Sequence, residues 1–483
     1  MSLRPRLGCM LLLTALLAQP GTPKVYVRWT QRVLPPAKTL GVDELVIPWS
    51  DAAQGLIAEA RKQGYRVFVE VKFQDAQAAA DASAKAGIAG IILTGEAKEQ
   101  NQVQQAAQKL RAANPKVKIL ILDAGGKQPH MRGWLVFKKD GILQVSSPTS
   151  QPWLDANLTL VLHERAYQSD QRPLYTFSWD VSDPLVKEQG PKPEDYSLAI
   201  AEAGAYHADL ILEMYEKQQK GLAEGDKQAL ADWKQVKRYI DFYERANPGA
   251  AEPQARVGVL TEDYDLPYEP MNLMARHNIP FRVRRSSEVK AHDLDKLDVV
   301  IAFAALSKEQ VDAITDFATR GGVAVLVNLP GAYPWESSTP EKKGEHVATY
   351  TVGKGRVIEL GEALTDPETF AQDVRRLMAK EQIPVSLWNS LTTLTVSYDG
   401  EKASETTVEL VNYAEEATQV QVQVLGKFAS VHLETPERGC CETLKASHVD
   451  GMTEFVVPDV VIGARVHLTG TASRSTSQAT SAH

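Results

Sequence analysis

Cysteine is scarce in this sequence: three among 483 residues, at Cys9, Cys440 and Cys441. Adjacent cysteines cannot staple distant parts of a chain, and two sulfurs make a poor metal site. The sequence therefore excludes a disulfide framework and a structural zinc centre. Two states of the Cys440–Cys441 pair stay open: a vicinal disulfide in an oxidising compartment, or two partly buried thiols in a loop of a β-rich domain.

The chain also lacks a concentrated run of positive charge. It has 53 Lys and Arg against 61 Asp and Glu, for a formal net charge of −8. Nucleic acid binding needs a concentrated cationic surface, so that partner is not expected.

Metal and cofactor motifs are missing too. His163, His207, His277 and His346 show no ligand spacing such as His-x-x-x-His, so no metal site is expected. The Asp-Ala-Gly-Gly-Lys segment 123–127 could cradle an anion, but it lacks the Walker spacing and is more typical of a turn. No cofactor is expected.

Long apolar runs are confined to the N-terminus. Arg4 and Arg6 precede the run Leu7–Leu17, which leads into Ala18-Gln19-Pro20-Gly21. This pattern predicts a secretory signal peptide over residues 1–20, and hence export to the periplasm or the cell exterior. A buried N-terminal helix is the alternative. The run is too short to span a membrane, and no later segment qualifies.

What is present is a long alternation of strand and helix patterns over residues 24–247. Such alternation favours a parallel sheet with crossover helices, and eight strands at this spacing fit a compact (β/α)8 TIM-like barrel. A helix is expected over Gln151–Tyr167, capped by Ser150, and Trp134–Ser147 is expected to form a β-hairpin leading into the sixth strand. The expected strands are Val25–Trp29, Glu44–Trp49, Arg66–Phe73, Ala89–Thr94, Lys118–Asp123, Leu143–Ser147, Leu174–Trp179 and Asp209–Met214.

Two further domains follow a linker at 247–253. Residues 254–383 repeat the alternation on a smaller scale and predict an open α/β domain of flavodoxin-like type. Residues 385–469 alternate as strands without helices and predict a β-sandwich. The Ser/Thr/Ala-rich tail 470–483 is expected to be disordered.

This domain order, together with three local segments, resembles the family-42-type β-galactosidases and related glycoside hydrolases. Segment 317–327, Phe-Ala-Thr-Arg-Gly-Gly-Val-Ala-Val-Leu-Val, looks like the helix–Gly-Gly–strand unit of their glutamine-amidotransferase-like middle domain. Gly353–Ile358 looks like its late hairpin, and Leu410–Tyr413 resembles a strand of the C-terminal sandwich. The resemblance implies a catalytic barrel, an oligomerising middle domain and a carbohydrate substrate.

The sequence departs from that family in two ways. The hydrolases carry an Asn-Glu pair at the end of barrel strand four, and this chain has no Asn-Glu pair. A working amidotransferase needs a nucleophilic cysteine, and none lies between Cys9 and Cys440. The middle domain is therefore expected to be structural, or to form a homo-oligomer.

Catalytic groups of a barrel lie at the carboxyl ends of its strands. Glu96 and Asp180 follow strands four and seven, where the resemblance places the acid/base and the nucleophile. Glu96 could instead simply favour the dipole of the following helix. Glu213 interrupts an apolar strand, where a carboxylate is costly unless it is functional or ion-paired.

Aromatic and polar side chains on the same rim are what sugar binding needs, because aromatic faces stack on pyranose rings while carboxylates accept from hydroxyls. Glu70 and Lys72 share one face of strand three, and they could instead form a buried pair with Arg28 or Asp123. The predicted substrate-binding residues are Arg28, Trp29, Trp49, Glu70, Lys72, Asp123, Trp179 and Tyr215.

Two functions remain open on the sequence alone. The first is a secreted glycoside hydrolase that acts through the rim carboxylates. The second is a non-catalytic glycan-binding or scaffolding protein with a degenerate barrel.

Overall fold

A computed structural model of the chain describes residues 22–50, 52–123, 127, 134–136, 153–168, 171–179, 184–245, 250, 252–378 and 383–470. Its first sheet has seven strands in the order β5-β4-β3-β2-β1-β9-β8, and neighbouring strands are parallel. The strands are β1 (Val25–Arg28), β2 (Glu44–Pro48), β3 (Arg66–Lys72), β4 (Gly90–Thr94), β5 (Lys118–Ile121), β8 (Leu174–Phe177) and β9 (Asp209–Glu213). They match seven of the eight expected strands, and Leu143–Ser147 lies outside the described residues.

The two edge strands of this sheet are joined to each other. The N–H of Asp123, after β5, donates to the carbonyl of Leu174 at the start of β8 (2.9 Å). The Gln171 side chain accepts from the N–H of Ile121 (3.0 Å) and donates to its carbonyl (2.8 Å). We call these bonds the seam. They curl the sheet into a barrel-like form.

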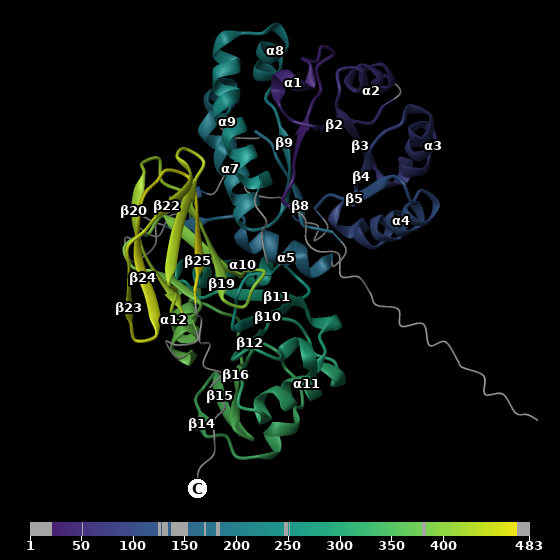
Figure 1. Cartoon of the computed structure of the whole chain (residues 1–483). Helices are drawn as coiled ribbons and strands as arrows, with labels where there is room; N and C mark the ends of the chain where they lie inside the picture. The colour runs from purple at the N-terminus through teal and green to yellow at the C-terminus, as the bar shows by residue number, and fades with distance from the viewer. Residues whose placement is uncertain are drawn as a thin grey trace, which may run out of the picture.

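Helices cover the outer side of the curled sheet (Figure 1). Their apolar faces and the outward side chains of the strands form one large core, to which Trp233, Val236, Tyr239, Ile240 and Tyr243 contribute at the expected helical spacing. The helices are α1 (Ala37–Leu40), α2 (Ala53–Lys62), α3 (Ala76–Ala86), α4 (Gln100–Ala113), α5 (Leu158–Tyr167), α6 (Pro184–Gln189), α7 (Pro193–Ala205), α8 (Glu216–Glu224) and α9 (Lys227–Arg245).

The segment between β5 and β8 differs from the expectation. The helix expected from Gln151 begins only at Leu158, and Trp153–Asp155 forms strand β7 instead. β7 pairs antiparallel with β6 (Trp134–Val136). The expected hairpin over Trp134–Ser147 lies mostly outside the described residues, because they include only 134–136 of it. Local patterns cannot identify the partner of β6, because tertiary pairing decides it.

The second sheet has the order β11-β10-β12-β13-β16-β15-β14. Its five parallel strands follow the 2-1-3-4-5 order of flavodoxin-like sheets, as expected for this region. The elements are β10 (Val257–Thr261), α10 (Asp265–Arg276), β11 (Phe281–Arg285), β12 (Val299–Ala302), α11 (Lys308–Thr319), β13 (Val323–Val327), β14 (Lys342–Lys343), β15 (Val347–Val352), β16 (Gly355–Leu360) and α12 (Pro367–Leu377).

Glycines fix the turns that the sequence singled out in this sheet. A Cβ on Gly355 would lie 2.1 Å from the carbonyl oxygen of Gly322 and 2.4 Å from that of Ala318. The Gly321-Gly322 turn after α11 and the Gly353–Gly355 turn before β16 therefore approach each other at backbone distance, which only glycine permits.

The third part consists of two antiparallel sheets, β17-β20-β24-β23 and β18-β19-β25-β21-β22. They pack on each other through one apolar core that includes Leu410, Val422 and Phe455. The strands are β17 (Val385–Leu387), β18 (Thr393–Asp399), β19 (Glu405–Asn412), β20 (Thr418–Leu425), β21 (Ser430–Thr435), β22 (Gly439–Thr443), β23 (Ala446–Val449), β24 (Met452–Val460) and β25 (Gly463–Thr469).

The three parts share buried contacts. Figure 1 shows α7 and α9 between the first sheet and the C-terminal strands. At that junction Glu202 accepts from Tyr413 Oη (2.8 Å) and from the side-chain amide of Asn157 (2.9 Å), while Tyr206 and Tyr413 pair through their hydroxyls (2.8 Å). Arg465 and Glu409 form a buried ion pair under Phe242 of α9.

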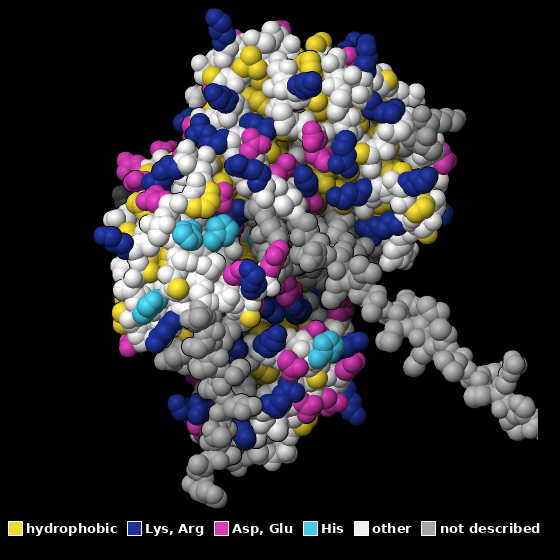
Figure 2. All heavy atoms as spheres, in the orientation of Figure 1, with side chains coloured by type: hydrophobic (Ala, Val, Ile, Leu, Met, Phe, Trp, Pro, Cys, Tyr) yellow, Lys and Arg dark blue, Asp and Glu magenta, His cyan; other side chains and the backbone are white. Residues whose placement is uncertain are grey.

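The predicted signal peptide, residues 1–20, and the tail 471–483 lie outside the described residues. Among the helices that the structure describes, none combines the length and the apolarity needed to cross a membrane. On the face shown in Figure 2, basic and acidic side chains are intermixed, consistent with the absence of a cationic patch in the sequence.

Candidate functional site

The inner face of the curled sheet carries side chains in layers, because alternate residues of a strand point to the same face. A middle layer is apolar and consists of Tyr26, Val46, Phe68, Ile92, Leu120, Leu122, Leu174 and Ile211. Two residues farther toward the carboxyl ends, the same face becomes polar: Arg28 follows Tyr26, Glu70 follows Phe68, and Glu213 follows Ile211. The polar layer thus lies where a barrel carries its chemistry.

Arg28 is the centre of this polar layer. Its Nη2 lies 2.6 Å from Oε2 of Glu70 on β3, and its Nη1 lies 2.7 Å from Oε2 of Glu213 on β9. Nη2 also donates to the hydroxyl of Thr176 on β8 (3.4 Å). The side chains of Arg28 and Glu70 are 13% and 17% exposed, whereas that of Glu213 is 38% exposed. One guanidinium therefore compensates two carboxylates, and Glu213 is the more accessible of them.

Asp123, which follows β5 and takes part in the seam, is the remaining member of this polar group. It adopts φ = 47°, a left-handed conformation that aspartate tolerates better than most residues. Burial raises the pKa of its carboxyl group to about 7, with the charge of Glu70 adding to the rise and that of Arg28 opposing it. Arg28, Glu70, Asp123, Thr176 and Glu213 are called the Arg28 cluster below.

Three buried polar atoms of the cluster have no hydrogen-bond partner within the described part of the chain: Nε of Arg28, Oε2 of Glu70 and Oδ1 of Asp123. Oε2 of Glu70 is compensated by its ion pair with Arg28, which leaves the Arg28 donor and the Asp123 oxygen. Buried polar groups are rarely left unpaired, and those that are mark functional sites or bound solvent. The cluster thus offers a donor and a titratable oxygen to an incoming polar ligand.

The structure brings together four of the predicted site residues: Arg28, Glu70, Asp123 and Glu213. It confirms the buried pair of Glu70 with Arg28 and the ion pair of Glu213, both of which the sequence had offered as alternatives to a direct role. Thr176 was missed. Its signal was available, since it lies two residues after Leu174 on the same face of β8.

Glu96 lies outside the cluster on an exposed turn after β4. Its carboxylate is 70% exposed and pairs with Lys98 at 2.8 Å, and the hydrogen bond and charge of Lys98 lower its pKa. The charge of Lys72, whose side chain is exposed, lowers the pKa of Glu96 further. Asp180, the other half of the predicted pair, lies outside the described residues.

The aromatic rim differs from the expectation. Trp29 is fully buried in the outer core, and its indole N–H donates to the carbonyl of Val33 (3.1 Å). The prediction that Trp29 contacts substrate is wrong, because Arg28 faces inward and its neighbour on the strand must face outward. Trp49 and Trp179 are partly buried against the same outer core, and the hydroxyl of Tyr215 donates to the carbonyl of Lys187 (3.0 Å).

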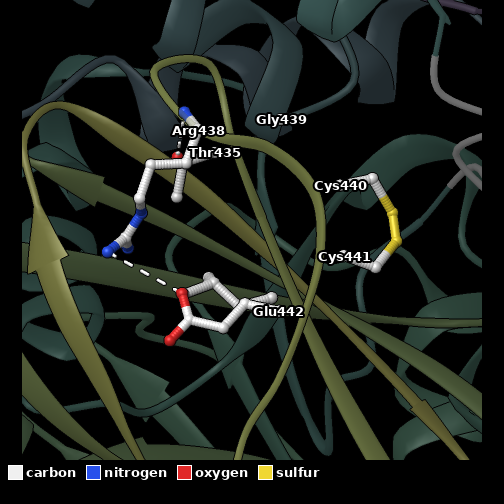
Figure 3. Close-up of a pocket in the computed structure, with 7 residues that line it drawn as sticks. Thr435, Arg438, Gly439, Cys440, Cys441 and Glu442 are labelled. Carbon is white, nitrogen blue, oxygen red and sulfur yellow. Dashed lines mark hydrogen bonds and ion pairs between the residues drawn. A yellow bond between two sulfur atoms is a disulfide. The ribbon is translucent and has the colours of Figure 1, made fainter.

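A pocket of about 230 Å³ lies elsewhere, on the edge strand β22 (Figure 3). It is lined by Leu433, Thr435, Arg438, Gly439, Cys440, Cys441 and Glu442. Cys440 and Cys441 lie side by side on β22 and both are exposed, so the expectation that the pair is partly buried is wrong. Arg438 is compensated by Glu442 and Asp459, each at 3.8 Å, which leaves this pocket little charge to bind a ligand.

Clusters of three or more His, Cys, Asp or Glu side chains suited to a metal ion do not occur among the described residues. The Arg28 cluster itself supplies carboxyl groups, one guanidinium and one hydroxyl. Such groups can move a proton, stabilise a developing charge and hold hydroxyl groups of a ligand.

Comparison with known proteins shows that the chain is similar in fold to several solved structures. No protein-family model and no curated protein sequence matches the chain. Among solved structures, α-L-fucosidase isoenzyme 2 from Paenibacillus thiaminolyticus is similar with a TM-score of 0.58 at 11% identity, over 93% of this chain and 99% of that one. A β-galactosidase from Rahnella sp. R3 is similar with a TM-score of 0.57 at 10% identity, over 91% of this chain and 99% of that one.

A third structure, the β-galactosidase from Bacillus circulans sp. alkalophilus, has a TM-score of 0.50 at 9% identity over 93% of this chain and 99% of that one. The likeness extends over nearly the whole length of each enzyme, whereas the sequences have diverged almost completely. In fold, the chain thus resembles these three glycoside hydrolases.

Proposed function

We propose that this chain is a carbohydrate-active protein, and specifically a glycoside hydrolase that acts through carboxyl groups at the carboxyl end of its barrel sheet. The observation that carries the proposal is the Arg28 cluster, which gathers three carboxyl groups in the layer where barrel enzymes hold their reactive groups. The fold shared with an α-L-fucosidase and two β-galactosidases supports it.

Glycoside hydrolysis needs one carboxyl group that donates a proton and one carboxylate that acts as nucleophile or base. Asp123, with a pKa raised to about 7, is protonated in a substantial fraction of molecules at neutral pH and suits the acid. Glu213 is ion-paired with Arg28 and partly exposed, which suits the carboxylate. Glu70 would then position Arg28, whose Nε is left for a ligand oxygen.

Glu96 and Asp180 remain the alternative pair, since they follow the fourth and seventh predicted strands. We also propose that residues 1–20 direct export to the periplasm or the cell exterior, and that the middle domain forms a homo-oligomer. Each is tested directly, by N-terminal sequencing of the exported protein and by sedimentation.

The enzyme proposal is tested with nitrophenyl glycosides, starting with α-L-fucosides and β-D-galactosides, and with a glycan array. Glu213→Gln and Asp123→Asn should each lower kcat/KM by about 10²–10⁴-fold, the usual contribution of a catalytic acid or base. Glu44→Gln is the matched control. Glu44 also pairs with an arginine, Arg66, but at the amino end of the sheet, so its loss should leave turnover unchanged.

Other outcomes point elsewhere. Turnover could survive Glu213→Gln and Asp123→Asn but be lost in Glu96→Gln and Asp180→Asn. That result would identify Glu96 and Asp180 as the catalytic pair. Glycan binding without turnover in the wild-type protein would make the barrel a binding module. An absence of both binding and turnover over the whole panel would refute the proposal.

A further inference from the structure

The outer face of the sheet β17-β20-β24-β23 carries an exposed aromatic side chain that the barrel site does not use. Trp388, which directly follows β17, is 61% exposed. Leu387 before it points into the apolar core between the two C-terminal sheets, so alternation directs Trp388 to the opposite, solvent side. Exposing so large an apolar surface is unfavourable unless something covers it.

The strand register places polar groups beside this tryptophan. The N–H of Trp388 donates to the carbonyl of Gln421 on β20 (3.1 Å), and Gln421 pairs with Val456 on β24. Residues paired across antiparallel strands share a face, so Trp388, Gln421 and Val456 form one row on the solvent side. Gln421 is exposed, and Val456 is 43% exposed.

A second row runs alongside the first. Ser386 on β17 pairs with Gln423 on β20, which pairs with Glu454 on β24. The side-chain amide of Gln423 donates to the Glu454 carboxylate. Ser386 and Gln423 are buried, at 9% and 6% exposed, and support the surface from below. The groups that reach solvent are therefore the Trp388 indole, the Gln421 amide, Val456 and the Glu454 carboxylate. We call this surface the Trp388 platform.

The backbone under the platform is fixed. The side chain of Asn389 accepts from the N–H of Gln421 (2.7 Å) and donates to the carbonyl of Gln419 (3.1 Å). With the Trp388–Gln421 bond, three hydrogen bonds tie residues 388 and 389 to β20. A rigid aromatic residue loses little entropy when a ligand binds to it, which favours binding.

We propose that the Trp388 platform is a second carbohydrate-binding site, separate from the barrel, that takes a neutral polysaccharide. A pyranose ring has an apolar C–H face that stacks on an indole and a rim of hydroxyls that bond to amides and carboxylates. Neighbouring strands lie about 4.8 Å apart, so a platform three strands wide accommodates one or two sugar units. Glu454 disfavours polyanionic chains. The site does not depend on hydrolysis by the barrel.

The test is affinity electrophoresis of the full chain in gels that contain barley β-glucan, galactomannan, arabinogalactan or xylan, with polygalacturonate as the anionic comparison. The wild-type protein should be retarded by at least one neutral polymer. Trp388→Ala should weaken that binding about 10-fold or more, as expected for the loss of an aromatic stacking contact, and Trp388→Phe should retain most of it. Gln421→Ala should weaken it less.

Val347→Ala is the matched control, because Val347 is also an exposed apolar side chain, at 42%, but lies on β15 of the middle sheet. Trp388→Ala should leave turnover of the nitrophenyl glycosides unchanged, and this separates the platform from the proposed active site. Failure of all four neutral gels to retard the wild-type protein, or equal retardation of Trp388→Ala, would overturn the inference. So would loss of self-association in Trp388→Ala with retardation intact, which would make the surface a protein interface.

Discussion

Arg28 holds the candidate site together because it is the positive charge that lies between two carboxylates on separate strands. Removing a partner from a buried ion pair leaves the other charge uncompensated, and this costs more than the pair itself contributes. Substitution of Arg28 should therefore affect both the stability of the fold and the arrangement of the Arg28 cluster.

Arg28→Met should lower the free energy of unfolding by about 3 kcal/mol, because Glu70 and Glu213 would then repel each other in a half-buried layer. The triple variant Arg28→Met, Glu70→Gln, Glu213→Gln should recover most of that loss. Urea unfolding followed by tryptophan fluorescence measures both. A single variant as stable as the wild-type protein would show that the ion pairs are solvated rather than buried.

Asp123 should give stability a characteristic dependence on pH. Its pKa is about 7 in the folded chain and near 4 in the unfolded chain, so the folded state binds more protons between those values. Its contribution to stability is therefore complete below about pH 4 and is lost as the pH rises through 7. From pH 5 to pH 7.5, the free energy of unfolding measured by urea titration should fall less for Asp123→Asn than for the wild-type protein. An equal fall for both proteins would refute the raised pKa of Asp123.

Much of the local structure could be predicted from the sequence because the elements have regular periods. The strands β1–β5 ended within two residues of the expectation. Trp29 was misplaced because a strand end was expected to present both Arg28 and its neighbour, although alternation allows only one of them to face inward. The pairing of β6 with β7 could not be predicted, since no local pattern specifies a partner.

The close approach of the two glycine turns in the middle sheet predicts the effect of a substitution on stability. Gly355→Ala should destabilise the chain by about 3 kcal/mol, because the added Cβ would collide with the backbone carbonyls of Gly322 and Ala318, which cannot rotate away. Gly344→Ala is the control, since its Cβ would meet nothing closer than 3.7 Å. Thermal unfolding of both variants tests this, and equal midpoints would contradict it.

The barrel and the C-terminal sheets are coupled by buried polar contacts. Glu202 lies on α7 of the barrel and accepts a hydrogen bond from Tyr413 of the C-terminal sheets. Burial raises the pKa of the Glu202 carboxyl group. The apolar core outside the barrel sheet also includes Leu394, Val396 and Val411 from those sheets. The barrel and the C-terminal sheets should therefore unfold together.

Tyr413→Phe should lower stability by about 1–2 kcal/mol, because it removes a hydrogen bond to a buried carboxylate. Tyr175→Phe is the matched control: Tyr175 is equally buried, but its hydroxyl has no partner among the described residues, so the change should be neutral or stabilising. Calorimetry should show a lower midpoint for Tyr413→Phe alone. The opposite ranking of the two variants would contradict the role of Tyr413.

The seam that closes the barrel sheet constrains how this protein can diverge. Position 123 must keep a left-handed backbone so that its N–H reaches Leu174, and only Gly, Asn and Asp adopt that conformation readily. Relatives can thus carry Asn or Gly at this position and retain the seam, whereas a β-branched residue would disrupt it. A carboxyl group can therefore be lost from the Arg28 cluster by a single substitution while the architecture persists.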